Sequence, residues 1–148
     1  MPITLYSQVT DTAVFASELN QAAVSAIIDA SQVQTITGRL VDILTVYKNT
    51  NIRELGNEDI VITDTEIDSV QLLELVDFTS GLIDANLVPT IKGNYDDIKT
   101  AIDSNIKFGK SLDVFATVNI LDTEIQTSQL ITLNDYITTG VIDASLVS

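Results

Sequence analysis

The chain has 148 residues, the length of one ordinary domain, and it contains neither cysteine nor histidine. Without these residues it has no disulfide and no thiolate nucleophile, and it lacks the commonest general base and metal ligand. Seven basic residues against 21 acidic ones give a net charge of −14. This charge disfavours contact with nucleic-acid phosphates and anionic membranes, so we expect no nucleic-acid partner. No apolar run approaches the ~20 residues of a membrane span, so we expect no membrane insertion.

Charged residues are unevenly distributed along the chain. All seven Lys and Arg residues lie between Arg39 and Lys110, and both ends are rich in Ile, Val, Ala, Leu, Thr, Ser and Gln. The N-terminus has neither the basic region nor the continuous apolar region of a signal peptide. Weakly charged ends are unusual for termini in water, so we expect them to contact other surfaces.

One sequence element occurs three times and organises the chain. It reads SAIIDASQVQTITG at residues 25–38, FTSGLIDANLVPTIKG at residues 78–93 and TTGVIDASLVS at residues 138–148. The shared core is a pair of aliphatic residues, Asp-Ala, Ser or Asn, one residue and then Val. The two complete copies continue with Thr-Ile-x-Gly. Self-similarity of this kind indicates a repeat protein.

The predicted elements follow one another in a fixed order. Each unit opens with a strand that ends in Asp-Thr, at residues 3–11, 59–65 and 114–123. A helix follows at residues 16–24, 69–79 and 127–137, with Ser69 and Thr127 as the expected N-caps. Gly81 and Gly140 are expected to end these helices in a left-handed conformation.

A tight Ile-Asp-Ala turn then leads to a short buried strand at residues 33–36 and 88–91, and a second helix is predicted at residues 40–48 and 95–104. The fold class is therefore mixed α/β, a compact repeat of strand–helix–turn–strand–helix units of about 55 residues with solenoid-like stacking. We expect a single domain of two and a half units, at residues 3–58, 59–113 and 114–148, the last of them truncated. Strands 33–36 and 88–91 are predicted to lie near each other in parallel, because helical crossovers join parallel strands.

The recurring aspartates are the strongest candidates for chemistry. Asp29, Asp84 and Asp143 are weak calcium candidates, because carboxylates are the ligands that calcium prefers. The alternative is that these residues, and likewise Asp11, Asp64 and Asp122, cap helices or build turns with nearby backbone. The sequence favours the structural role, because acidic residues one or two positions apart with interleaved Gly are missing.

No catalytic arrangement emerges from the sequence. The neighbouring carboxylates 58–59 and 96–97 are expected to point apart and to be solvated rather than to form an acid–base pair. Ser and Thr lack a histidine base, there is no Ser-x-x-Lys motif, and no phosphate-binding glycine loop is present. Tyr47, Tyr95 and Tyr136 are predicted to be core residues. We expect no enzyme activity, no catalytic residue and no cofactor.

A family resemblance rests on the pattern Asp-Thr-x-Ile, then Gly-x-Ile-Asp-Ala-Ser-x-Val-x-Thr-Ile-x-Gly. This pattern resembles tandem repeats in very large surface proteins of marine cyanobacteria, and it is similar to segments in structural proteins of cyanobacterial phages. The resemblance covers nearly the whole chain and contains no catalytic position. It implies outer surfaces, many copies, and adhesion or assembly.

Two functions remain open from the sequence. The first is a virion component such as a capsid decoration or cement protein of a phage, whose partner is the major capsid protein or another copy. A start at its own Met without a signal peptide favours this function. The alternative is an adhesive or calcium-binding repeat module at a bacterial cell surface. In both, the truncated third unit is expected to expose an interaction surface made of Leu130, Leu133, Val141, Ile142 and Val147. The competing hypothesis is that this unit folds back and exposes only Thr, Ser and Gln.

Overall fold

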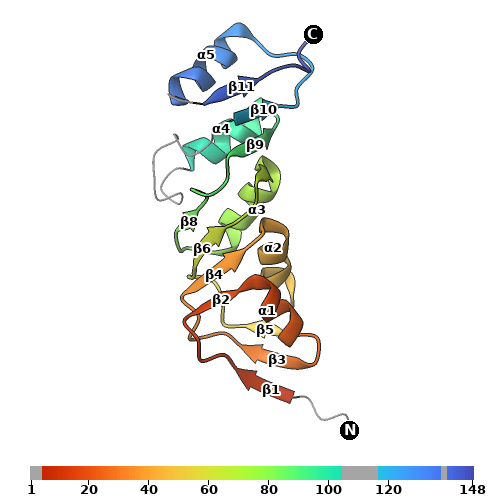
Figure 1. Cartoon of the computed structure of the whole chain (residues 1–148), viewed down its shortest axis with the longest axis vertical. Coiled ribbons are helices and arrows are strands. Elements are labelled where there is room, and N and C mark those ends of the chain that lie inside the picture. The colour runs from red at the N-terminus through yellow and green to blue at the C-terminus, as the bar shows by residue number, and fades with distance from the viewer. Residues whose placement is uncertain (1–4, 105–116, 138–139) are drawn as a thin grey trace.

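The computed structural model describes residues 5–104, 117–137 and 140–148. These segments form five helices and eleven strands, and the strands are arranged in three sheets. The elements follow one another along a long axis, with β1 and β11 towards opposite ends (Figure 1). The mixed α/β class is confirmed.

The three sheets are built from short strands, and every strand pairing among the described residues is parallel. The first sheet has the order β1 (Leu5–Gln8), β3 (Ala26–Asp29) and β5 (Ile52–Arg53). The second has the order β2 (Ala13–Phe15), β4 (Thr35–Gly38), β6 (Asp59–Ile62) and β8 (Ile83–Asp84). The third has the order β11 (Val141–Asp143), β10 (Thr117–Ile120), β9 (Thr90–Gly93) and β7 (Glu66–Asp68).

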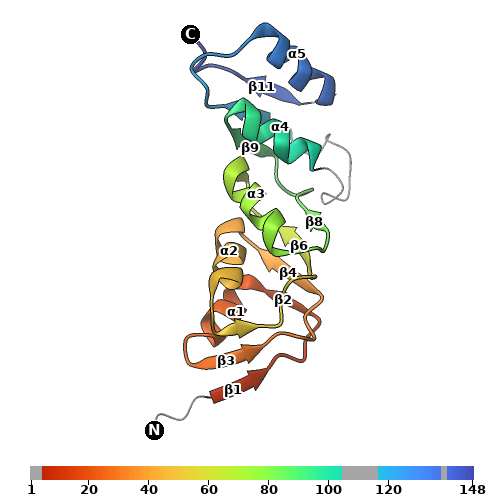
Figure 2. The same ribbon diagram turned by 180° about the vertical axis from the view of Figure 1, so that it is seen from behind.

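The five helices are α1 (Ala16–Ala22), α2 (Leu40–Lys48), α3 (Ser69–Phe78), α4 (Tyr95–Asp103) and α5 (Thr127–Tyr136). Successive helices from α1 to α4 contact each other along the stack, as the view from behind also shows (Figure 2). Helices this short are marginal alone in water, so packing against the sheets and the neighbouring helices stabilises them. Two predicted N-caps are wrong by one residue, because Asp68 and Gln126 occupy the N-cap positions and Ser69 and Thr127 begin the helices.

Aliphatic side chains of neighbouring strands lie beside one another and form the core. In the second sheet Ile36 pairs with Ile60, which pairs with Ile83, and all three are fully buried. In the third sheet Ile91 is flanked by Ile67 and Val118, again with almost no exposure. Strands of parallel sheets are covered by helices and buried, and such strands are typically rich in Ile and Val.

The segments 33–36 and 88–91, predicted to lie near each other in parallel, contribute to strands β4 and β9 of different sheets, although Ile36 and Ile91 belong to one core cluster. Strand β4 lies between β2 and β6, and β9 lies between β7 and β10 in a different sheet. The strands on both sides of β4, and those on both sides of β9, are closer in sequence than β4 and β9 are to each other. Closing a short loop costs less conformational entropy than bringing distant segments together, so the nearer strands pair.

Candidate functional site

The aspartates of the repeated element build tight turns. Asp29 accepts a hydrogen bond from the Ser31 N–H at 3.0 Å, and Asp84 accepts one from the Asn86 N–H at 2.8 Å. Asp143 does the same with the Ser145 N–H at 3.0 Å. Such side-chain-to-backbone bonds two residues apart define an Asx turn. In the first copy, the hydrogen bond from the Ser31 backbone holds the pKa of Asp29 below its ordinary value.

The structure does not bring the three calcium candidates together. Asp29 ends a strand of the first sheet, Asp84 one of the second and Asp143 one of the third. Within residues 5–104, 117–137 and 140–148, no group of three or more acidic side chains is placed to hold a metal ion. The observed role of each aspartate is therefore local, in its own turn.

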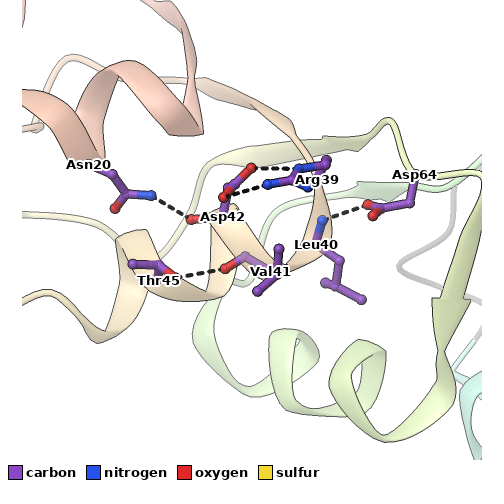
Figure 3. Close-up of polar contacts among 7 residues, drawn as sticks. All are labelled: Asn20, Arg39, Leu40, Val41, Asp42, Thr45 and Asp64. Carbon is purple, nitrogen blue, oxygen red and sulfur yellow. Dashed lines mark hydrogen bonds and ion pairs between the residues drawn. The ribbon is translucent and has the colours of Figure 1, made fainter.

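A second set of aspartates caps helices that precede them in the chain. Asp64, just after β6, accepts a hydrogen bond from the backbone N–H of Leu40 at 2.6 Å, at the first residue of α2 (Figure 3). Asp122 accepts the equivalent bond from Tyr95 at 2.6 Å, at the first residue of α4. A carboxylate here satisfies an orphan N–H and interacts favourably with the helix dipole. Asp11, which the sequence pattern groups with Asp64 and Asp122, is exposed.

Two of the contacts in Figure 3, Asn20–Asp42 and Leu40–Asp64, join α2 to other elements, and the rest are local to α2. The Asn20 side chain of α1 donates to the carbonyl of Asp42 at 2.9 Å, and the Arg39 guanidinium bonds the Asp42 carboxylate at 2.9 Å. The Arg39–Asp42 pair is exposed and contributes little stability by itself. The Asn20 Oδ1 atom in this view is buried and has no hydrogen-bond partner.

Glu58 forms a polar cluster that the sequence analysis did not find. Its side chain is 1% exposed, so the prediction that this carboxylate is solvated is wrong. One carboxylate oxygen accepts from the Gly56 N–H at 2.8 Å and from the Tyr47 hydroxyl at 2.9 Å. Burial, with the nearby Glu58 charge and hydrogen bond, raises the pKa of Tyr47 above its ordinary value. The Tyr47 ring also stacks on Phe78, with centroids 5.5 Å apart.

The same cluster explains why residue 81 is a glycine. A Cβ atom at Gly81 would lie 2.1 Å from the carbonyl oxygen of Glu58, so only glycine fits this close approach of two backbones. Helix α3 ends at Phe78, and Gly81 does not have positive φ, so the predicted left-handed helix end is wrong. Thr79 completes the cluster by donating to the Glu58 carbonyl at 2.8 Å and accepting from the Gly81 N–H at 3.0 Å.

The three tyrosines predicted to be core residues are buried or pack against the core. Tyr95 is buried and Tyr47 is packed against the core cluster, as predicted. Tyr136 also packs against that cluster and donates a hydrogen bond to Asp103 at 3.3 Å. Asp96 and Asp97 lie side by side in the first turn of α4, where negative charge stabilises a helix.

The C-terminal end has an open apolar groove. A groove of about 380 Å³ lies between α5 and β11; we call it the C-terminal groove, and its lining residues are Thr127, Leu130, Ile131, Asn134, Ile142 and Ala144. Two of the five predicted interaction residues, Leu130 and Ile142, line it. Val141 is 62% exposed, and Leu146 is 53% exposed. The hypothesis that this unit exposes only Thr, Ser and Gln is therefore wrong.

Leu133 does not belong to this surface. It is fully buried, because α5 directs Leu133 and its C-cap residue Ile137 into the core. Ile131, which the sequence analysis did not name, is instead 57% exposed and lines the groove. No local signal identifies it, because Ile131 aligns with Leu73 of α3, which packs against the core cluster.

Comparisons with known proteins add no relationship: no family model matches the chain, and no curated protein or solved structure is significantly similar to it. In the described segments, no helix has both the length and the apolar character needed to cross a membrane.

Proposed function

We propose that this protein is a non-enzymatic assembly protein that attaches to a larger particle through its C-terminal end. The observation that carries the proposal is the C-terminal groove, beside which Ile131 and Val141 are 57% and 62% exposed. Grouped aliphatic side chains at a surface are typical of protein–protein contacts. At the opposite end, β1 exposes Leu5 and Tyr6 and offers a second contact.

We further propose that the chain is a solenoid of units of about 55 residues. Corresponding pairings support this architecture, because β4–β6 places Ile36 beside Ile60 and β9–β10 places Ile91 beside Val118. The next strands also correspond, with Val61 beside Asp84 and Asn119 beside Asp143. Units of a solenoid contact mainly their neighbours, and each of these pairings joins strands of the same unit or of neighbouring units.

The particle we propose is a virion, with the protein as a capsid decoration or cement protein. This step rests on the sequence resemblance to structural proteins of cyanobacterial phages. The net charge of −14 supports an outer position, because it disfavours contact with packaged nucleic acid. An elongated arrangement of elements suits a protein that bridges or extends from a shell.

Co-sedimentation tests this function. Purified protein is mixed with empty shells of the major capsid protein encoded by the same genome, and light scattering records its own oligomeric state. We expect saturable binding that Ile131→Asp abolishes. The matched control is Val70→Asp on α3, because Val70 and Ile131 are both 57% exposed. Binding that Ile131→Asp leaves intact, or a monomer that ignores the shells, contradicts the proposal.

A further inference from the structure

The sheets do not coincide with the sequence units. In the second sheet, β2 and β4 belong to the first unit, residues 3–58, whereas β6 and β8 belong to the second unit, residues 59–113. In the third sheet, β7 and β9 belong to the second unit, and β10 and β11 belong to the third unit, residues 114–148. Each of these two sheets therefore crosses a boundary between neighbouring units.

The second and third sheets match each other strand by strand. Strand β2 corresponds to β7, β4 to β9, β6 to β10 and β8 to β11. The paired residues correspond as well: Val14–Ile36 recurs as Ile67–Ile91, Ile36–Ile60 as Ile91–Val118, and Ile60–Ile83 as Val118–Ile142. The element that recurs in space is thus a four-stranded sheet with two strands from each of two units.

Neither half of the second sheet has enough strand pairing to be stable alone. The half from the second unit, β6 and β8, pairs at two residue positions, and the half from the first unit, β2 and β4, pairs at three. Two short paired strands are at best marginally stable in water. The longest pairing of this sheet joins β4 to β6 across the unit boundary, at four positions. It places the fully buried Ile36 and Ile60 side by side, so both units depend on it.

Helix capping crosses both boundaries as well. Asp64 of the second unit accepts the hydrogen bond from Leu40 at the start of α2, in the first unit. Asp122 of the third unit accepts the bond from Tyr95 at the start of α4, in the second unit. Each helix loses the acceptor of that N–H when the next unit opens. Opening of one unit therefore weakens a helix of the unit before it.

The Glu58 cluster adds a buried contact across the first boundary. Tyr47 and Glu58 belong to the first unit, and Phe78 and Thr79 belong to the second. The Tyr47 ring stacks on Phe78, and the Thr79 hydroxyl donates to the Glu58 carbonyl at 2.8 Å. Glu58 and Thr79 are both buried, so separation of the units would break a hydrogen bond that is shielded from water.

We propose that the shared sheets form an interlock, through which the opening of one unit opens its neighbour. The stability of a repeat array is approximately a sum of terms for the units and terms for the interfaces between them. Here the first interface contains the longest pairing of the second sheet, a helix cap and the Glu58 cluster, so the interface term dominates. The inference rests on the proposed repeat units and does not depend on which particle the protein binds. A chain without a separable joint holds its two ends at a fixed separation, which suits a role in assembly.

Native-state hydrogen exchange on the full chain tests the interlock, with the amides of Thr35 and Ile60 as reporters. The Thr35 N–H donates to Thr12 within the first unit, and the Ile60 N–H donates to Leu82 within the second. Ile36→Val shortens a buried side chain of the first unit and should speed exchange at Thr35 by about fivefold. The interlock predicts the same increase at Ile60. Low concentrations of urea make both amides report cooperative opening rather than local motion.

The reverse experiment places the substitution in the second unit. Coupling between two sites is reciprocal, so Ile83→Val should speed exchange at Thr35 as much as at Ile60. The matched control is Val24→Ala in the first unit. Val24 is 85% exposed, so this variant should leave both exchange rates unchanged.

An increase that stops at the unit boundary overturns the inference. If the units open separately, Ile36→Val speeds exchange at Thr35 and at the Asp59 amide, which donates to the first unit, but not at Ile60. Likewise, Ile83→Val then leaves the rate at Thr35 unchanged. Co-sedimentation with shells does not measure this coupling. Shell binding can therefore fail while the interlock holds, and the interlock can fail while shells still bind through Ile131.

Discussion

Strand β7 (Glu66–Asp68) and residues 124–126 differ in structure although their sequences agree. Both follow Asp-Thr, both begin with Glu-Ile, and both lead into a ten-residue helix. The first is a strand with Ile67 buried against Ile91, and the second is an irregular segment with Ile125 half-buried. In this protein, strand formation therefore depends on whether a partner strand is present, in agreement with the strong context dependence of β-propensity.

The largest expected effect is the difference in stability between truncating Ile67 and truncating Ile125. Ile67→Ala removes a buried side chain, which costs about 2–5 kcal/mol of unfolding free energy. Ile125→Ala is expected to cost less than about 1 kcal/mol, because little contact is lost at a half-exposed site. Urea denaturation of the two variants measures the difference. Equal losses would mean that the two segments are equally covered in solution.

Glycine at the end of each Thr-Ile-x-Gly strand gives the next effect. Gly93 has φ of +157°, and a Cβ atom would lie 1.9 Å from the Ser69 hydroxyl. Gly93→Ala should therefore cost about 2–3 kcal/mol. At Gly38 the nearest atom is the Ala16 Cβ at 3.0 Å and φ is ordinary, so Gly38→Ala should cost about 1 kcal/mol. A smaller loss for Gly93→Ala than for Gly38→Ala in thermal or urea unfolding would contradict this order.

The next comparison is between the helix-capping aspartates Asp64 and Asp122 and the exposed Asp11. Asp64→Ala and Asp122→Ala each remove the acceptor of a 2.6 Å bond from a helix N-terminus. A loss of about 1–2 kcal/mol is expected for each. Asp11→Ala, at the exposed equivalent position, serves as the control and is expected to change stability by less than about 0.5 kcal/mol. A similar loss at all three positions, measured by chemical denaturation, would show that Asp11 also has a partner.

Ser69→Ala is expected to stabilise the protein. The Ser69 hydroxyl is buried and has no hydrogen-bond partner, whereas the first copy has alanine at this position, Ala16. Removing an unsatisfied buried hydroxyl should raise the unfolding free energy by about 1 kcal/mol. The single variant reproduces the glycine–alanine pair of Gly38 and Ala16, and the double variant Ser69→Ala/Gly93→Ala should recover part of the loss seen for Gly93→Ala, because it lacks the Ser69 hydroxyl. A destabilised Ser69→Ala variant in differential scanning calorimetry would indicate that the hydroxyl has a partner in solution.

The smallest effect is expected for the cross-strand ion pair. The side chains of Lys92 and Glu66 are 38% and 43% exposed, so water screens their attraction. Lys92→Ala should cost less than about 0.5 kcal/mol, and the cost should fall further as salt is added. A large loss that persists in high salt would mean that the pair contributes more to β7–β9 pairing than exposed pairs usually do.

Local features of the fold were predictable from the sequence. The Asp-Ala turns, the five helices and the alternation of helices with short strands depend on residues that lie a few positions apart. Asp29 bonds the backbone two residues later, and the same bond recurs at Asp84 and Asp143. Hydrogen bonds and helical periodicity over such distances are set by neighbouring residues, so these turns and helices can be predicted without knowledge of the tertiary contacts.

Only the tertiary structure decides which distant segments meet. It pairs β4 with β6 rather than β9, buries Glu58 beneath the Tyr47 hydroxyl and directs Leu133 into the core. It also buries Ile67 and leaves Ile125 only half-buried, although the two residues have nearly the same local sequence. Burial and strand pairing depend on contacts between residues far apart in sequence, and the free energy of those contacts exists only once both partners are in place.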